Sequence, residues 1–427
     1  MNPDQALQEL YDLQRFSIKM GLDNIQALCN FLGNPQEQFP SIHIAGTNGK
    51  GSTAVLIQRI LSLHGLQTGL YTSPHLVDFN ERIRIDEALI DNHYMASFWH
   101  STRDLILTRK ATFFDATTAL AFKYFAENRV DLAVIETGLG GRLDSTNILR
   151  PRAVVLTPID RDHEKQLGKD YAGIAREKAA IIKDGAMVFS AGQRPEAEEV
   201  LNLFRHRPDG FVFAPEQTRV SNVVLDGDGI NFTLTDLMRN TTYGNIRLSM
   251  VGEHQAANAA LAYLSARWYL EQIDFRFSEK KFRKALANIC WPGRLHKIAS
   301  NPDIIFDVSH NESGFETSLK YAAKHYKDHR RLLLLGLLSD KDFHQIAAMV
   351  SKVFERIMVT EPVSPRKMDA GALQEVFRKQ GIEAEAIPEL EKAYRKASKN
   401  LAENEVLFVM GSHFLIGELF KTIRKRT

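Results

Sequence analysis

Short apolar runs alternate along the chain with longer segments of helical periodicity. The first of these runs lack the alternation of apolar and polar residues expected of a strand with one solvated face; they lie at residues 41–45, 69–72, 130–136 and 153–158. Strands buried on both faces and separated by helices are typical of a parallel sheet covered by helices. The pattern therefore predicts an α/β fold.

The rhythm changes between about residues 188 and 247, where short alternating stretches surround Asp226-Gly227-Asp228-Gly229, a sequence typical of a hairpin turn. We expect a small antiparallel insertion there, within a first domain that spans residues 1–291. Trp291-Pro292-Gly293 interrupts regular structure and marks the boundary. After this boundary, apolar runs again alternate with helical segments, which predicts a smaller α/β domain over residues 298–427. Its strands are expected at 303–308, 332–337, 356–360 and 405–410.

Composition narrows the class of partner. The 427 residues are 44% hydrophobic and 25% charged, and 54 basic against 52 acidic residues leave a formal charge of only +2. No global field then attracts nucleic acid or an anionic membrane, so we expect small-molecule partners and, by default, a monomer. The N-terminal stretch lacks a secretory core and the apolar run at 332–338 is too short to span a bilayer, which favours a cytoplasmic location. Cys29 and Cys290 are expected to be reduced structural thiols.

The stretch AGTNGKGST looks like a phosphate-binding loop with unusual spacing. The usual pattern is G-x-x-x-x-G-K-[ST], whereas here two residues separate Gly46 from Gly49, and Gly51 stands between Lys50 and Ser52. The loop joins the first predicted strand to a predicted helix, whose free N–H groups and positive dipole end attract anions. Lys50 adds a charge for the β and γ phosphates. We predict a nucleotide site; the alternative is a glycine-rich turn with a solvent-facing lysine.

Polar side chains stand where three of the predicted strands end. Glu136 ends one strand, Ser73 follows another, and Asp160-Arg161-Asp162-His163 follows a third. The carboxyl ends of parallel strands form the ligand-binding edge of such sheets, where a carboxylate is well placed to hold Mg²⁺. Taken singly, Glu136 could be a surface charge, His163 a helix cap and Ser73 a turn residue. Their joint occurrence favours a metal site.

A series of motifs covers nearly the whole chain in this order: GTNGKGS, TSPHL, ETGLGGRLDSTN, DHEKQLG with AREKAAIIK, HQAANAALA, PGR and DVSHN. As a set they resemble the folylpolyglutamate synthases and dihydrofolate synthases of the Mur ligase superfamily. The resemblance implies a large P-loop domain and a small C-terminal Rossmann-like domain, with ATP held between them. It also implies an ATP-dependent amide ligase, which activates an acid as an acyl phosphate, joins L-glutamate to it, and releases ADP and phosphate.

The same resemblance assigns roles to individual residues. Those at the ATP are Gly46, Thr47, Asn48, Gly49, Lys50, Gly51, Ser52, Asn258, Arg294 and Asp307, and those that organise Mg²⁺ are Ser73, Glu136 and His163. Lys178 matches a lysine that the family can carry as a carbamate, with a catalytic role beside Lys50 and His163. Carbamylation needs the neutral amine, so the site would have to lower the pKa of Lys178 from about 10.4.

The residues alone leave other roles open for these positions. Asn258 could lie on an exposed helix face, Arg294 in a linker, and Asp307 at a loop cap. Lys178 could form a plain salt bridge to a glutamate.

For the acid substrate, the resemblance implies a pterin-bearing acid, either dihydropteroate or a folate that already carries glutamate. It places near the pterin Thr112, Phe113, Phe114, Asp115, Arg142, Leu143 and Asp144. The two phenylalanines offer a flat wall for a heterocycle, although a core helix contains such residues as well. Members that make dihydrofolate often extend glutamate chains too, so we expect a bifunctional enzyme.

One motif departs from the family pattern. Members often read DGAHNP or DVAHNP, where this chain has Asp307-Val308-Ser309-His310-Asn311-Glu312. The departure puts in doubt the start of the following helix more than the nucleotide contact.

Two rival functions stay open. A cell-wall Mur ligase would be expected to carry a further N-terminal domain for its nucleotide-sugar. A P-loop phosphotransferase would make a stable phosphorylated product.

Overall fold

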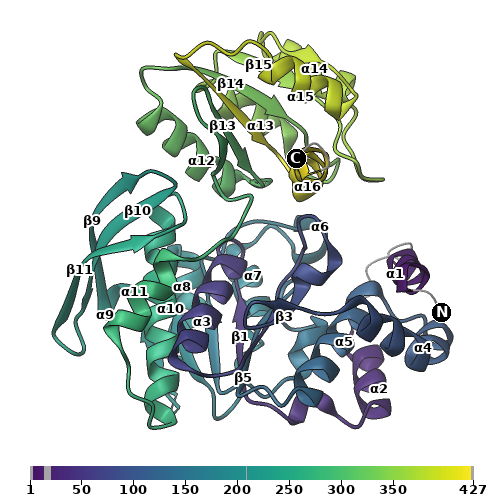
Figure 1. The fold of residues 1–427 in the computed structure, drawn as a ribbon, viewed down its shortest axis with the longest axis vertical. Coiled ribbons are helices and arrows are strands. Elements are labelled where there is room, and N and C mark those ends of the chain that lie inside the picture. Colours follow the sequence, from purple (N-terminus) through teal and green to yellow (C-terminus); the bar gives the residue numbers. More distant parts are fainter. Residues whose placement is uncertain (1–2, 14–20, 208, 425–427) are drawn as a thin grey trace. The chain divides into compact units, whose positions relative to one another are not determined.

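The computed structural model describes residues 3–13, 21–207 and 209–424. The chain forms two compact units (Figure 1). The first consists of Met1–Asn222, Phe232–Arg247 and Ala256–Ile289, and the second of Val223–Asn231, Leu248–Gln255 and Cys290–Thr427. The second unit therefore includes two segments that precede the predicted boundary.

The first unit is built on an eight-stranded sheet of order β4-β3-β2-β5-β1-β6-β7-β8. The strands from β2 to β8 in this order pair in parallel, and β3 and β4 are antiparallel additions at one edge. The strands are β1 (Ser41–Ala45), β2 (Thr68–Tyr71), β3 (Ile83–Ile85), β4 (Ala88–Leu89), β5 (Leu132–Glu136), β6 (Ala153–Leu156), β7 (Met187–Ser190) and β8 (Phe211–Phe213). Every residue of β1, β2, β5 and β6 is buried, which confirms the predicted parallel sheet.

Helices bury the apolar side chains of this sheet. One hydrophobic cluster joins α1, α2, α4 and α5 to β2, β3 and β5, another joins α7 and α8 to β6 and β7, and α3 packs on β2 and β5. The α-helices are α1 (Pro3–Asp12), α2 (Asp23–Phe31), α3 (Lys50–His64), α4 (Asn92–Arg109), α5 (Phe113–Glu127), α6 (Glu164–Leu167), α7 (Tyr171–Ala179), α8 (Pro195–Asn202), α9 (Ala214–Gln217), α10 (Glu253–Gln272) and α11 (Glu279–Ala287). Short 3-10 turns are η2 (Pro35–Glu37), η3 (Phe79–Arg82) and η4 (Ser145–Ile148).

The antiparallel part is shorter than predicted. The small sheet, of order β11-β10-β9, contains only β9 (Thr218–Asp226), β10 (Gly229–Asp236) and β11 (Thr241–Leu248). The expected start at residue 188 is wrong, because β7 and β8 extend the parallel sheet. The sequence does not reveal β8 because this strand has only three residues and lacks the long apolar run of the other parallel strands. The helix before it, α8, is rich in glutamate and adds no apolar run either.

The second unit holds a six-stranded sheet of order β12-β13-β17-β14-β15-β16, in which only β12 is antiparallel to its neighbour. Its strands are β12 (His296–Ala299), β13 (Asp303–Asp307), β14 (Arg330–Leu335), β15 (Arg356–Val359), β16 (Glu385–Ala386) and β17 (Glu405–Met410). Its helices are α12 (Glu312–His325), α13 (Phe343–Val350), α14 (Ala370–Lys379), α15 (Leu390–Ser398) and α16 (His413–Arg424). The predicted second α/β fold, with its own hydrophobic core, is confirmed.

Membrane-crossing helices are absent from the part of the chain that the structure describes, since no helix there combines sufficient length with sufficient apolar character.

The departure from the family motif leaves the start of α12 intact. Asn311 is the N-cap, and its Oδ1 accepts a hydrogen bond from the N–H of Gly314 at 2.9 Å. Glu312 stands where the family often has proline and is the first helical residue, a position that suits proline and, through the helix dipole, a carboxylate as well. Glu312 also accepts a hydrogen bond from Gln345. The exchange of residue therefore preserves the helix start.

We expect Glu312→Pro to change the free energy of unfolding by less than about 0.5 kcal/mol, because the first helical N–H has no intrahelical partner. Asn311 already has the extended backbone that a following proline requires (φ −128°, ψ 166°). Asn311→Ala removes the cap and should cost about 1 kcal/mol. Urea unfolding of both full-length variants measures the difference. A larger loss in Glu312→Pro than in Asn311→Ala would show that this description of the helix start is wrong.

Candidate active site

The glycine-rich loop leads from β1 directly into α3, as predicted. The helix begins at Lys50, and Gly49 is its N-cap with a left-handed backbone (φ 84°). The Thr47 N–H donates to the carbonyl of Pro158 at 2.8 Å, and the Thr47 hydroxyl donates to the carbonyl of Asp160 at 2.7 Å. The loop is therefore tied to the segment that follows β6.

Two glycines of the loop have no room for a side chain. A Cβ atom at Gly46 (φ 153°) would lie 1.8 Å from the Thr157 hydroxyl oxygen, and one at Gly49 would lie 2.8 Å from Oδ1 of Asn258. Asn258 thus lies against the loop and is 6% exposed, which rules out the exposed helix face left open by the sequence. Close packing holds the loop backbone in one conformation, as an anion-binding turn requires.

Lys50 lies over its own loop. Its Nζ donates to the carbonyl of Thr47 at 3.0 Å, and the side chain is partly buried rather than solvent-facing. In the same first turn of α3, Gly51 and Ser52 are buried, whereas Asn48 before it is half-buried. An anion at this helix start would meet the charge of Lys50 as well as free backbone N–H groups.

Lys178 supports the loop from α7. Its Nζ donates to the carbonyl of Gly46 at 2.7 Å, and the side chain is 4% exposed. Burial, together with the positive charge of Lys50, lowers the pKa of Lys178 to about 7. The neighbouring Glu177 accepts a hydrogen bond from Nε of Arg142 at 2.8 Å, so that glutamate pairs with arginine. Near neutral pH a substantial fraction of Lys178 is therefore the neutral amine that carbamylation requires.

Glu136 and the phosphate loop emerge from neighbouring strands. β1 and β5 pair in parallel, and Ile44 lies opposite Glu136. Ile44 is two residues before Gly46, the first glycine of the loop. Glu136 is 4% exposed, which rules out a surface charge, and its Oε2 accepts a hydrogen bond from the N–H of Ser73 at 3.1 Å. The structure therefore brings the loop, Glu136 and Ser73 to one edge of the sheet.

His163 precedes α6 with a left-handed backbone (φ 52°). Its N–H donates to Oδ1 of Asp162 at 2.8 Å, and its Nε2 lies 3.9 Å from Oδ2 of the same residue. Within residues 3–13, 21–207 and 209–424, no three or more His, Cys, Asp or Glu side chains form a group that could hold a metal alone. The role of His163 at Mg²⁺ stays a prediction.

Hydrogen bonds join the two segments predicted to contact the pterin. Thr112 and Asp115 form a capping box at the start of α5, and Asp115 also accepts a hydrogen bond from the Ser145 hydroxyl at 2.7 Å. Asp144 caps η4 and accepts from the N–H of Leu139 at 2.7 Å, while burial raises the pKa of Asp144. These polar residues hold the two segments in place, and their contact with a pterin stays a prediction.

The two phenylalanines are half-buried and pack on other parts of the unit. Phe114 covers Gly138, where a Cβ would lie 2.4 Å from the ring, and Phe113 stacks on Tyr11 with ring centroids 5.9 Å apart. Arg142 is exposed and Leu143 is half-buried. Their pterin roles also stay predictions.

Arg294 and Asp307 lie in the second unit. Asp307 is 4% exposed and accepts hydrogen bonds from the N–H groups of Leu295 and Ser309, at 2.8 and 2.9 Å. The loop-capping role left open for Asp307 is therefore present. Nη2 of Arg294 lies 3.4 Å from Nε2 of His413. The nucleotide contacts of Arg294 and Asp307 stay predictions.

Three further polar side chains lie beside the site segments of the first unit and are not predicted from the sequence. They are Tyr11, His43 and Arg82. His43 is fully buried in β1, its Nε2 lies 2.7 Å from Oγ1 of Thr146, and burial lowers its pKa to about 3. The sequence does offer one sign of His43, because a histidine inside the otherwise apolar stretch SIHIA is unusual. Tyr11 and Arg82 have no such signal, because their importance lies in contacts with distant segments.

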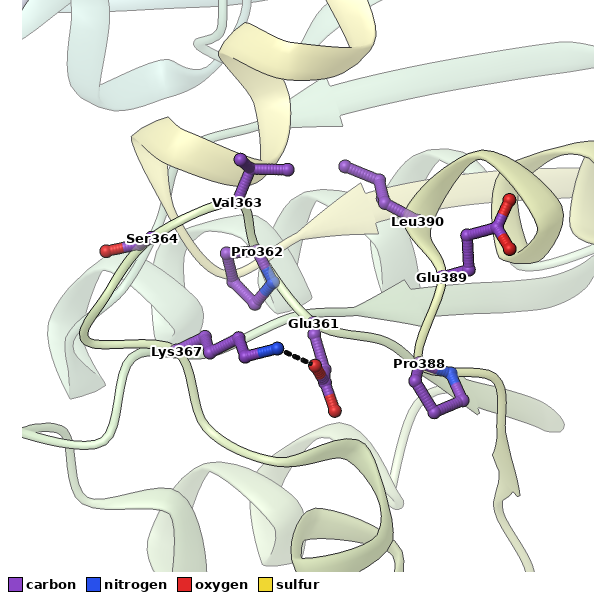
Figure 2. Close-up of a pocket in the computed structure, with 8 residues that line it drawn as sticks. All are labelled: Glu361, Pro362, Val363, Ser364, Lys367, Pro388, Glu389 and Leu390. Carbon is purple, nitrogen blue, oxygen red and sulfur yellow. Dashed lines mark hydrogen bonds and ion pairs between the residues drawn. The ribbon is translucent and has the colours of Figure 1, made fainter.

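A cavity of about 510 Å³ lies in the second unit, just beyond β15 and β16 (Figure 2). Its lining residues are Glu361, Pro362, Val363, Ser364, Lys367, Pro388, Glu389 and Leu390. Figure 2 shows Lys367 paired with Glu361. None of the residues predicted to bind a substrate lines this cavity.

Known proteins resemble the chain over nearly its whole length. The Mur ligase middle domain matches residues 44–266, and the glutamate ligase domain of Mur ligases matches residues 293–413. The dihydrofolate synthase/folylpolyglutamate synthase of Bacillus subtilis is 31% identical over 422 residues, with 96% of each chain covered. The folylpolyglutamate synthase of Mycobacterium tuberculosis complexed with ADP has a TM-score of 0.89 at 31% identity, over 99% of each chain. A folylpolyglutamate synthase complex with AMPPCP and folate has a TM-score of 0.88 at 30% identity, over 99% of this chain and 100% of the other.

We expect Gly46→Ala to weaken ATP binding at least about tenfold, because the new Cβ would overlap the Thr157 hydroxyl and displace the loop. Gly244→Ala is the matched control, since a Cβ there meets no heavy atom within 4 Å. Equilibrium titration with ATP measures both Kd values. Equal Kd values for the two variants would rule out a binding role for the loop.

Lys178 is expected to make stability rise with pH. Its pKa is about 10.4 in the unfolded chain, whereas burial holds the folded value at about 7. Between these values the unfolded state binds more protons, so the free energy of unfolding increases with pH. Relative to Lys178→Met, wild-type protein should gain on the order of 2 kcal/mol between about pH 7 and pH 9. Urea unfolding across this range measures the gain, and a constant difference would mean that the pKa is not lowered.

Proposed function

Because the chain belongs to the Mur ligase family, and within it to the folylpolyglutamate and dihydrofolate synthases, we propose that it adds L-glutamate both to dihydropteroate and to folates that already carry glutamate. Family membership makes the protein an ATP-dependent ligase that forms carbon–nitrogen bonds. The bifunctional assignment is supported by the B. subtilis relative, whose name contains both activities.

One observation carries the proposal: a phosphate-binding loop and a buried carboxylate emerge from adjacent parallel strands. The register of β1 and β5 sets Ile44 opposite Glu136, so the loop that begins at Gly46 and the carboxylate share one edge of the sheet. Phosphoryl transfer from ATP needs this combination of an anion site and a metal-binding carboxylate.

The residues at this edge fit Mg²⁺, which prefers oxygen ligands and commonly uses one or two carboxylates together with waters and substrate phosphates. Glu136 supplies a buried carboxylate, held by the Ser73 N–H, and Ser73 supplies a hydroxyl. We assign Mg²⁺ to Glu136 and Ser73, with His163 as a further ligand and a carbamate on Lys178 as an additional oxygen donor. When bound, the ion neutralises charge on the transferring phosphoryl group.

The reaction forms an acyl phosphate and then an amide. A carboxylate oxygen of the acid substrate attacks the γ-phosphorus of ATP, the bond from that phosphorus to the bridging oxygen breaks, and ADP departs. The amino group of glutamate then attacks the acyl carbon, loses a proton, and displaces phosphate together with the oxygen that came from the carboxylate. The protein acts mainly by positioning and charge. Lys50 and the first N–H groups of α3 bind the triphosphate, and Lys178 holds the Gly46 carbonyl.

Two rival functions predict different products. A P-loop phosphotransferase would use the same loop but would need no glutamate, and a cell-wall Mur ligase would act on a nucleotide-sugar. The test is phosphate release by full-length protein with MgATP, L-glutamate and either dihydropteroate or tetrahydrofolate, with products weighed by mass spectrometry. Addition of one glutamyl residue to each acid is the expected result. Phosphate release without an amide product, or no ATP consumption with either acid, would overturn the proposal.

In the same assay, Glu136→Gln should lower kcat at least about hundredfold, because glutamine keeps an acceptor for the Ser73 N–H but lacks the charge that holds Mg²⁺. Glu127→Gln, at the exposed end of α5, is the matched control and should leave kcat unchanged. If the Glu136→Gln enzyme keeps most of its activity, Glu136 does not have the proposed role of binding the metal.

A further inference from the structure

Arg82 is a nearly buried cation where two segments of the candidate active site meet. It is the last residue of η3 and is 7% exposed. Its carbonyl accepts a hydrogen bond from the Thr72 N–H at 2.9 Å, directly before Ser73 of the metal site. Its guanidinium carbon lies 5.2 Å from the centre of the Phe113 ring, in the segment predicted to lie near the pterin of the acid substrate. Arg82 therefore contacts both the segment that leads to Ser73 and the segment predicted to lie near the pterin.

The neighbours of Arg82 hold the guanidinium without pairing its charge. Its Nε donates to Nδ1 of His75 at 2.8 Å, so Nδ1 is the unprotonated nitrogen of a neutral ring. The adjacent Glu81 carboxylate accepts hydrogen bonds from the N–H groups of Leu76 and Val77, at 2.7 and 3.0 Å. In the described ranges of the chain, no ion pair joins Arg82 to a carboxylate.

Helix α1 fixes the side chains around the guanidinium. Glu9 accepts hydrogen bonds from Nε1 of Trp99 at 2.9 Å and Nε of Arg103 at 2.8 Å, which anchors α1 on α4. Tyr11 of the same helix stacks on Phe113 with an interplanar angle of 11°. The ring that supports Arg82 is therefore itself supported, and the guanidinium is pre-organised for binding.

A buried guanidinium without a paired anion costs folding free energy. Burial lowers the pKa of Arg82. Two hydrogen bonds connect Arg82 with the metal carboxylate through neighbouring residues: the Thr72 N–H donates to the Arg82 carbonyl, and the N–H of the next residue, Ser73, donates to Glu136. An anionic ligand at this position would supply the missing partner. The acid substrate carries such an anion, because its carboxylate must reach the γ-phosphoryl group beside Glu136.

We propose that Arg82 binds the substrate carboxylate that receives the phosphoryl group, with Phe113 and His75 holding the guanidinium in place. The inference rests on the proposed function, since it requires an acid substrate at this edge of the sheet. A guanidinium offers paired N–H donors whose geometry matches a carboxylate, and it stays positively charged at physiological pH. Arg82 would orient the attacking oxygen and offset its charge.

The test compares binding of dihydropteroate with binding of its methyl ester, by equilibrium dialysis with AMPPCP and Mg²⁺ present throughout. Wild-type protein should bind the acid at least about tenfold more tightly than the ester. Arg82→Met should reduce this preference by about ten- to hundredfold, the range expected for loss of one charge-assisted hydrogen-bonding partner. Arg84→Met, two residues further along on β3, loses the same charge and should keep the wild-type preference.

The outcomes separate a binding role from a structural one. If Arg82 only supports the fold, Arg82→Met weakens acid and ester in equal proportion and the preference stays, which overturns the inference. Equal binding of acid and ester by wild-type protein overturns it without any variant, so a misfolded Arg82→Met protein does not protect it. Wild-type protein that binds neither compound overturns the proposed function itself. Arg82→Lys, which keeps the charge but loses the paired donors, should show an intermediate preference.

Discussion

The parallel pairing of β1 with β5 is the constraint on which the candidate active site depends. Parallel strands end at the same edge of a sheet, so the register that sets Ile44 opposite Glu136 delivers a buried carboxylate to the start of the phosphate loop. Neighbouring elements keep that edge in shape: the segment after β6 binds Thr47, and α7 sends Lys178 to the carbonyl of Gly46. The buried core of the sheet therefore determines the geometry of the proposed nucleotide site.

The same edge concentrates polar groups that a core selected for stability alone would exclude. Lys178 is buried beside a carbonyl, and Arg82 is buried beside a neutral histidine. His43 has a buried Nδ1 for which the described residues supply no hydrogen-bond partner. Each of these groups costs folding free energy. Their presence in or beside the segments that form the candidate site is the pattern expected where packing is compromised for binding and catalysis.

Features with a local cause could be predicted from the sequence. The phosphate loop and the helix after it follow from glycine spacing, and the buried position of Glu136 follows from the apolar strand that it ends. Features with a distant cause could not be predicted. Lys178 and Gly46 are 132 residues apart, and neither residue's neighbours in sequence indicate the contact. The stacking of Tyr11 on Phe113 is hidden in the same way, and β8 is too short to be seen against the turns around it.

In the proposed mechanism, the residues at this edge of the sheet activate an acid by converting it to an acyl phosphate. The most direct measurement uses dihydropteroate labelled with ¹⁸O in its carboxylate, incubated with unlabelled MgATP, L-glutamate and full-length protein. If the acid attacks the γ-phosphorus, each phosphate released with the amide carries one ¹⁸O atom, which mass spectrometry detects. Phosphate free of ¹⁸O, formed at the same rate as the amide, would show that the acid is activated by another route and would contradict the central claim.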